Sequence, residues 1–148
     1  GNTILRFITA VIVLFSMNIS DTVVASEADQ TDAQLSAKDR VVLHVNNPNK
    51  IHLLKNSTDN LRRELGDTIE LVVVINGPAI TRMIKTSPNQ SEIEDMIDDG
   101  VKIEVCHNAI RRHEVDRNHL IPGVEPLTTD GSIAIIRYQK KGYHYVKI

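Results

Sequence analysis

Short runs of aliphatic residues alternate with amphipathic segments along the chain from residue 40 onward. The runs are rich in Val and Ile with little polar alternation, which is typical of parallel strands covered on both faces. The segments between them place apolar residues every three or four positions, which is typical of helices. The runs predict strands at 40–45, 69–75, 101–106, near Val124 and at 143–148.

Residues that favour helix ends mark the segments between these strands. Asn47 and Pro48 are expected to open the first helix, and Gly66 is expected to end it. Ser91 and Glu94 have the spacing of a capping box for a later helix. The other expectations are a short helix opened by Pro78, a helix end at Gly100, a polar helix over about 108–116, and a helix from Gly131 to Lys141 between Asp130 and Gly142.

The order strand, helix, strand predicts the architecture. Its repeat at intervals of about 25 to 30 residues indicates right-handed crossovers and therefore a mostly parallel sheet. Helices in such a chain cover both faces of the sheet, so we expect a three-layer α/β/α sandwich over residues 40–148. The run 69–75 is the strongest strand signal and is expected to lie at the centre of the sheet.

The N-terminal segment has a different character. Phe7 to Ser20 are fourteen uncharged residues that follow Arg6. Crossing the bilayer takes roughly 20 apolar residues, so this length fits the hydrophobic region of a secretory signal better than a membrane span. We predict a signal peptide over 1–25, cleaved after Ala25, and a periplasmic or secreted protein. The alternatives are an uncleaved segment that anchors the protein in a membrane and a hydrophobic helix that packs on the domain.

Charge and composition narrow the class of protein further. Residues 26–39 carry four acids and one base with almost nothing apolar, which predicts a polar linker. The chain has 17 Lys and Arg against 19 Asp and Glu, so it lacks the basic excess that nucleic-acid binding requires. A single cysteine, Cys106, excludes an internal disulfide and a cysteine-cluster metal site.

Several families of enzyme motif are missing from the sequence. His107, His113 and His119 are six residues apart, which places no two of them on one helical face as a metal site would need. The first strand-to-helix turn has no glycine, whereas a dinucleotide fingerprint needs three. Neither a hydrolase nor a dehydrogenase motif stands out. No metal or other cofactor is therefore expected.

Candidate chemistry gathers at the carboxyl ends of the predicted strands, where ligands bind in open parallel sheets. The residues that three strands deliver there are His44, Asn46 and Asn47, then Asn76 and Gly77, then Cys106, His107 and Asn108. Cys106 lies where a strand meets a helix, and the helix N-terminus together with Arg111 and Arg112 is expected to favour the thiolate. Gly77 is expected to supply a backbone angle that other residues avoid. The alternative for Cys106 is a buried residue that only packs, and His44 has the alternative role of a hydrogen-bonded core histidine.

Three segments together resemble the DsrE/DsrF-like family. They are Arg40-Val-Val-Leu-His-Val-Asn46, Leu71-Val-Val-Val-Ile-Asn-Gly-Pro78 and Gly100-Val-Lys-Ile-Glu-Val-Cys106-His-Asn108, and the resemblance extends over 40–148 to the closing Gly142-Tyr-His-Tyr-Val-Lys147. It implies a five-stranded parallel α/β/α fold of the YchN-like type and assembly into homotrimers or homohexamers. In sulfur-relay members, the cysteine that matches Cys106 accepts sulfane sulfur as a persulfide and passes it to a partner protein. Those members act in the cytoplasm, so the predicted leader departs from their pattern.

Two hypotheses follow. In the first, Cys106 forms a persulfide or acts as a redox-active thiol, His107, Asn108, Asn76, Gly77, His44 and Asn46 shape its pocket, and Arg111 or Arg112 holds the thiolate. A sulfur donor or acceptor protein is then the expected partner. In the second, the protein is an exported, non-catalytic oligomer in which Cys106 is structural and the asparagines hold a small anionic ligand. A membrane enters either hypothesis only if the N-terminal segment stays uncleaved.

Overall fold

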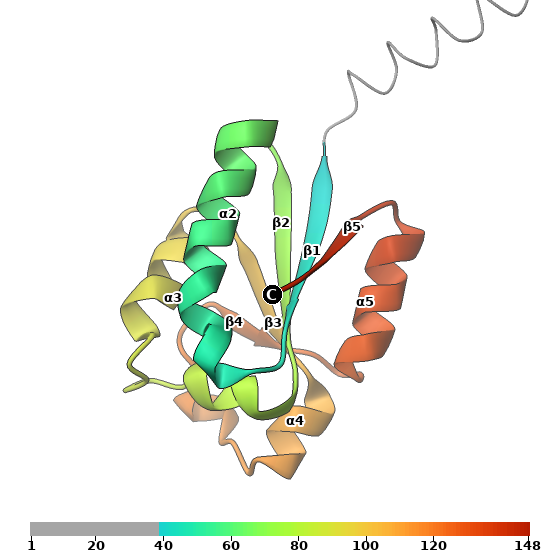
Figure 1. Ribbon diagram of the computed structural model, residues 1–148. Coiled ribbons are helices and arrows are strands. Elements are labelled where there is room, and N and C mark those ends of the chain that lie inside the picture. Colours follow the sequence, from blue (N-terminus) through green and yellow to red (C-terminus); the bar gives the residue numbers. More distant parts are fainter. Residues whose placement is uncertain (1–38) are drawn as a thin grey trace, which may run out of the picture. The chain divides into compact units, whose positions relative to one another are not determined.

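The computed structural model describes residues 39–148, and these form a five-stranded sheet with helices on both faces (Figure 1). The strands are β1 (Arg40–Val45), β2 (Glu70–Ile75), β3 (Lys102–Val105), β4 (Val124–Pro126) and β5 (His144–Lys147). Every neighbouring pair is parallel, and the order across the sheet is β4-β3-β2-β1-β5. The predicted three-layer architecture is confirmed, and β2 is the central strand as its sequence indicated.

The helices are divided between the two faces and one edge of the sheet. They are α2 (Ile51–Leu65), α3 (Gln90–Asp98), α4 (His107–Arg112) and α5 (Gly131–Lys140), with 3-10 helices η1 (Pro48–Lys50), η2 (Gly77–Arg82) and η3 (Arg117–His119). In Figure 1, α2 and α3 lie on one side of the sheet and α5 lies on the other. The strands run downward in that view, so α4 lies below their carboxyl ends.

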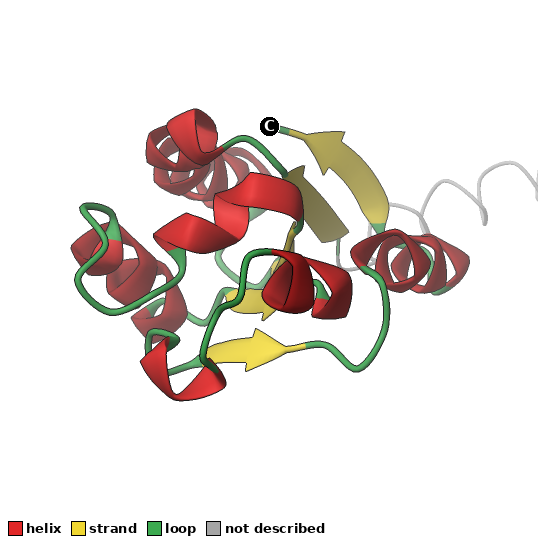
Figure 2. Ribbon diagram, turned by 90° about the horizontal axis from the view of Figure 1, so that it is seen from below, coloured by secondary structure: helices red, strands yellow, loops and turns green. Residues whose placement is uncertain are grey.

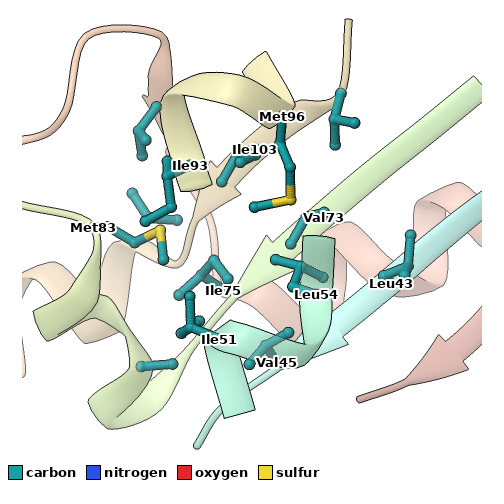
Figure 3. Close-up of a cluster of buried hydrophobic side chains, with 14 of the residues drawn as sticks. Leu43, Val45, Ile51, Leu54, Val73, Ile75, Met83, Ile93, Met96 and Ile103 are labelled. Atoms are coloured by element: carbon teal, nitrogen blue, oxygen red, sulfur yellow. The ribbon is translucent and has the colours of Figure 1, made fainter. Parts of the chain in front are cut away.

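Most of the core lies between the sheet and the layer of α2 and α3. Alternate residues of the central strands point into it, such as Val73 and Ile75 of β2, and meet Ile51 and Leu54 of α2 (Figure 3). All four side chains are fully buried. Burial of one such side chain contributes roughly 1.5–3 kcal/mol, so this layer supplies most of the hydrophobic stabilisation.

The layer on the α5 side is smaller and partly polar. Its buried apolar cluster is Val42, Val72, Val74 and Ile135. The Tyr138 hydroxyl of α5 donates a hydrogen bond to the carboxylate of Glu104 on β3, which is 6% exposed. Burial, and after it the Glu104 carboxylate, raises the pKa of Tyr138, which keeps the hydroxyl protonated as a donor.

Some predicted helix details are wrong. Ser91 does not cap α3, which begins at Gln90 after Asn89 with no side-chain cap. The Gln90 side chain instead accepts from the Thr86 N–H before the helix at 2.9 Å and donates to Glu94 within it at 2.7 Å, so Glu94 pairs with Gln90 and not with Ser91. The helix expected over 108–116 ends at Arg112 because the chain turns away at Glu114, whose φ is 51°.

Two predicted segments precede the domain. The predicted signal peptide, 1–25, and all but the last residue of the predicted linker, 26–39, lie outside the described residues. Within 39–148, no helix combines the length and apolar character needed to cross a bilayer.

Candidate functional site

A pocket of about 600 Å³ opens at the carboxyl edge of the sheet. Figure 2 views the molecule from below Figure 1, toward this edge. The lining residues are Asn46, Asn47, Pro48, Asn76, Gly77, Pro78, Cys106, Asn108, Ala109, Arg112, Asp130 and Ser132. They come from the turns and 3-10 helices after β1 and β2, from Cys106 and α4 after β3, and from the start of α5, so the edge of the sheet concentrates polar groups as the sequence predicted.

Cys106 joins β3 to α4 and lies in the wall of this pocket. Its backbone N–H donates to the Ile75 carbonyl at 2.8 Å, which continues the β2–β3 ladder by one residue. The residue lines the pocket although it is only 3% exposed, and it also belongs to the buried apolar cluster beneath. The Gly131 N–H, at the first position of α5, donates to Sγ at 3.2 Å. A main-chain donor at a helix N-terminus stabilises negative charge on the sulfur.

Asp130 is the second polar neighbour of the Cys106 sulfur, after the Gly131 N–H. It caps α5, with Oδ1 accepting from the Ser132 N–H at 2.8 Å. Its Oδ2 accepts from Asn108 Nδ2 at 2.8 Å, and the Cys106 thiol points to the same oxygen at 3.9 Å. The Ser132 backbone bond, followed by the Asn108 bond, lowers the pKa of Asp130, so its carboxyl is ionised at neutral pH.

Two asparagines on neighbouring loops are held by residues behind the pocket wall. His44 Nε2 lies 2.8 Å from Asn76 Oδ1, and His44 Nδ1 lies 2.8 Å from the Tyr145 hydroxyl. A neutral imidazole with its proton on Nε2 satisfies both contacts, and burial lowers the pKa of His44 and favours that neutral form. Asn46 Oδ1 accepts from Lys147 Nζ at 2.9 Å. Residues of β5 therefore fix the loops after β1 and β2.

The structure separates the predicted site residues into groups. Asn46, Asn76, Gly77, Cys106, Asn108 and Arg112 line the pocket, together with Asn47. His44 contacts Asn76 and does not line the pocket, so of the predicted alternative the hydrogen-bonded role holds, although the residue is half-buried rather than in the core. His107 also lies off the lining, and its Nδ1 is 3.3 Å from a guanidinium nitrogen of Arg117. Arg111 lines a second, smaller hollow with Asn108 and Arg112.

Sequence reasoning missed Asp130 and Ser132 as site residues, although it identified Asp130 as a helix cap. Asp130 follows β4 by four residues, and a survey of all strand ends rather than three would have included it.

The predicted role of Gly77 in its turn is confirmed by its φ of 57°. No described contact joins Arg111 or Arg112 to the sulfur, whose polar neighbours are the Gly131 N–H and Asp130.

The lining offers a thiol, a carboxylate, a guanidinium and four side-chain amides. Within residues 39–148, no group of three His, Cys, Asp or Glu side chains comes together as a metal site. The chemistry that these groups can perform directly is nucleophilic attack by the sulfur and hydrogen bonding to a polar ligand.

The fold and the site together define a class of protein, a parallel α/β/α domain with a cysteine at the carboxyl end of its third strand. The DsrE/DsrF-like family profile matches residues 12–148, and the chain belongs to this family, which includes sulfur-relay proteins. No curated protein sequence matches the chain.

Solved structures show the same fold. A protein of unknown function, MTH1491 from Methanobacterium thermoautotrophicum, has a TM-score of 0.70 at 24% identity and covers 75% of this chain and 100% of its own. The BT1422 protein of Bacteroides thetaiotaomicron has a TM-score of 0.59 at 20% identity, covering 74% and 95%. The ychN protein of E. coli has a TM-score of 0.58 at 14% identity, covering 76% and 100%. At these identities the likeness concerns the fold alone.

Proposed function

We propose that this protein handles sulfur through Cys106, which accepts a sulfane sulfur atom as a persulfide and passes it on. The observation that carries the proposal is the position of Cys106, which lines a polar pocket and whose Sγ accepts the Gly131 N–H at 3.2 Å. A cysteine that only filled space in the core would need neither feature. Membership of the DsrE/DsrF-like family supports the same reading.

The transfer needs no cofactor. The Cys106 thiol loses its proton to water, and the thiolate attacks the outer sulfur of a donor such as thiosulfate or polysulfide. A sulfur–sulfur bond forms on Cys106 while the donor's own sulfur–sulfur bond breaks, and its electron pair leaves with sulfite or a shortened polysulfide. A second nucleophile then removes the outer sulfur and restores the thiolate.

Mass spectrometry of the intact protein tests this proposal. Wild-type protein and Cys106→Ala are incubated with thiosulfate or polysulfide, and we expect the wild type alone to gain the mass of one sulfur atom. Dithiothreitol should remove the added sulfur. Cys106→Ser, which keeps a polar group of similar size, controls for any change in folding.

No added sulfur on the wild type with either donor, together with slow alkylation of the native thiol, would refute sulfur transfer. That result would favour the alternative, in which Cys106 is structural and the protein binds a small ligand without chemistry.

We also propose that the protein acts in the periplasm or after secretion. The support is the uncharged segment 7–20 followed by a polar stretch. Sequencing the N-terminus of protein isolated from the producing cell should find Ser26. Retention of residues before Ser26 would instead support the membrane-anchored alternative.

A further inference from the structure

Some of the hydrogen-bonding groups that line the pocket already have partners within the protein, and others do not. We propose that the pocket binds the oxyanion part of the sulfur donor, a thiosulfonate-type anion in which an outer sulfur is bonded to an SO₂ or SO₃ group. The amide nitrogens of Asn46 and Asn76 and the Arg112 guanidinium bind its oxygens, and its outer sulfur faces Cys106. This inference rests on the proposed function and names its substrate class.

The orientation of Asn46 is fixed by chemistry. The Lys147 ammonium can only donate, so Asn46 must present its carbonyl oxygen to Lys147. The amide nitrogen of Asn46 is then left for the pocket, and it makes no hydrogen bond with the described residues. Asn46 is therefore a donor toward any ligand.

Asn76 has the same arrangement through a different partner. Its carbonyl oxygen contacts His44 Nε2 at 2.8 Å, and the Tyr145 hydroxyl on His44 Nδ1 completes the neutral imidazole. The amide nitrogen of Asn76 is again the group left over. His44 and Lys147 thus act as positioning residues that turn two neutral amides into hydrogen-bond donors on one wall.

The lining carries one positive and one negative side chain, Arg112 and Asp130, and they differ in how far the protein already engages them. The Arg112 side chain makes no hydrogen bond or ion pair with the described residues, so its guanidinium is available to a ligand. The Asp130 carboxylate already accepts from the Ser132 N–H and Asn108 and is approached by the thiol, which leaves it little capacity for a ligand donor. Guanidinium and amide donors are the groups that bind planar and tetrahedral oxyanions with directional bonds.

The proposed donor chemistry balances without an oxidant. The Cys106 thiolate attacks the outer sulfur, the new sulfur–sulfur bond forms on Cys106, and the bond to the oxidised sulfur breaks. The electron pair leaves with sulfite or a sulfinate, whose oxygens remain hydrogen-bonded to the same donors. The amides and the guanidinium therefore stabilise both the bound donor and the leaving group.

The test compares two sulfur donors in matched variants of the full chain. The rate of sulfur addition to Cys106 is measured with thiosulfate and with polysulfide, which has no oxygen. Their ratio cancels any change in the thiol itself. The variants are Arg112→Leu and Asn76→Ala, and the control is Arg63→Leu, an exposed arginine at the far end of α2.

We expect the ratio of the thiosulfate rate to the polysulfide rate to fall about 10-fold or more in Arg112→Leu and Asn76→Ala and to stay within about twofold in Arg63→Leu, since a hydrogen bond to a charged ligand supplies roughly that factor. His44→Gln should lower the same ratio by a smaller factor. Methanesulfonate, an oxyanion without an outer sulfur, should slow the reaction of wild-type Cys106 with iodoacetamide and protect Arg112→Leu less.

The outcomes separate this inference from the proposed function. Sulfur addition from polysulfide, with an unchanged ratio in both variants and no protection by methanesulfonate, overturns the oxyanion site and leaves sulfur transfer standing. Protection by methanesulfonate that Arg112→Leu loses, without sulfur addition from either donor, supports the oxyanion site and overturns sulfur transfer. Absence of both protection and sulfur addition overturns both.

Discussion

Cys106 is subject to two opposing influences within 4 Å. The Gly131 N–H, 3.2 Å from Sγ, favours negative charge on the sulfur, whereas the ionised Asp130 carboxylate, 3.9 Å away, opposes it. The two groups come from adjacent positions at the start of α5. Asp130 is nevertheless needed where it is, because it caps the helix that supplies the N–H.

Replacing Asp130 by Asn should accelerate alkylation of Cys106 by iodoacetamide about fivefold at neutral pH. Asn is an equally good helix cap, so the variant removes the charge and keeps the Ser132 bond at Oδ1, while Asn108 must turn its own amide to accept from the new nitrogen. A unit charge near 4 Å is worth about 1 kcal/mol where water screens it, which corresponds to that factor. Alkylation rates under pseudo-first-order conditions measure the effect.

Asp130→Ala is the comparison for the cap. It should also alkylate faster, but it should lose about 1 kcal/mol of unfolding free energy in a urea titration, which Asp130→Asn retains. Equal alkylation rates for wild type and Asp130→Asn would show that the carboxylate does not influence the sulfur.

His44 should make the stability of the protein depend on pH. Burial, and after it Lys147, lowers the pKa of the folded imidazole against the upward effect of its bond to Asn76. Below the ordinary pKa of about 6.5, the unfolded chain binds a proton that the folded chain does not. The unfolding free energy is therefore expected to fall as the pH drops from 7.5 through about 6.5 to the lowered pKa.

Urea titrations of wild type and His44→Gln between about pH 7.5 and 5 measure this contribution. Gln keeps a donor for Asn76 but does not titrate, so its stability should decline less over that window. Parallel curves for the two proteins would contradict a half-buried His44 held in its neutral form.

The start of α5 is the element on which the site depends most. It supplies Asp130, the Gly131 N–H and Ser132 to the pocket, and it packs directly against the sheet at Gly131. A Cβ added at Gly131 would lie 3.3 Å from side-chain atoms of Val74, Asn76 and Cys106. The absence of a side chain is what lets the helix approach the sulfur closely.

Gly131→Ala is a test of that close approach. Helix propensity alone predicts that Ala stabilises a helix by up to about 1 kcal/mol over Gly. Overpacking costs about 1–3 kcal/mol, and three simultaneous close contacts put this site in that range, so we expect a net loss of stability. Thermal and urea unfolding measure it, and a variant as stable as wild type would show that α5 moves away from the sheet at little cost.

The two faces of the sheet bury different amounts of apolar surface, and the face covered by α5 leaves apolar side chains exposed. The α2 and α3 side buries a large core, whereas the buried apolar cluster on the α5 side has four members. Ile133 and Ile136 of α5 are 43% and 48% exposed, and Tyr145 of the edge strand β5 is 41% exposed. The family resemblance implies homotrimers or homohexamers, and we propose that these residues contribute to the contact between subunits.

Ile136→Asp should shift the protein toward monomers. A carboxylate in an apolar contact is costly to desolvate, whereas on a free surface it is harmless. Light scattering coupled to size-exclusion chromatography measures the mass. Leu53→Asp is the matched control, since Leu53 is 40% exposed on α2 and should leave the mass unchanged. A monomeric wild type, or equal effects of both variants, would contradict the proposed contact.

Local sequence patterns were sufficient to predict much of the fold. The strand 40–45 was predicted with its observed ends, and the run 69–75 was placed at the centre, because continuous aliphatic residues are stable only where both faces are covered. Asp130 was identified as the cap of α5 from its position before a helical segment. Cys106 and the asparagines were assigned to one edge because parallel strands all end there.

The composition of the pocket was decided by contacts between distant parts of the chain. Asn46 and Asn76 present their amide nitrogens because Lys147 and His44 occupy their oxygens, and Lys147 is 101 residues from Asn46. Asp130 and Gly131 meet the sulfur only because α5 crosses to the far face of the sheet and begins beside β3. Hydrophobic periodicity sets which face of an element is buried, but the polar partner of each group depends on how the elements pack, and that information is absent from local sequence.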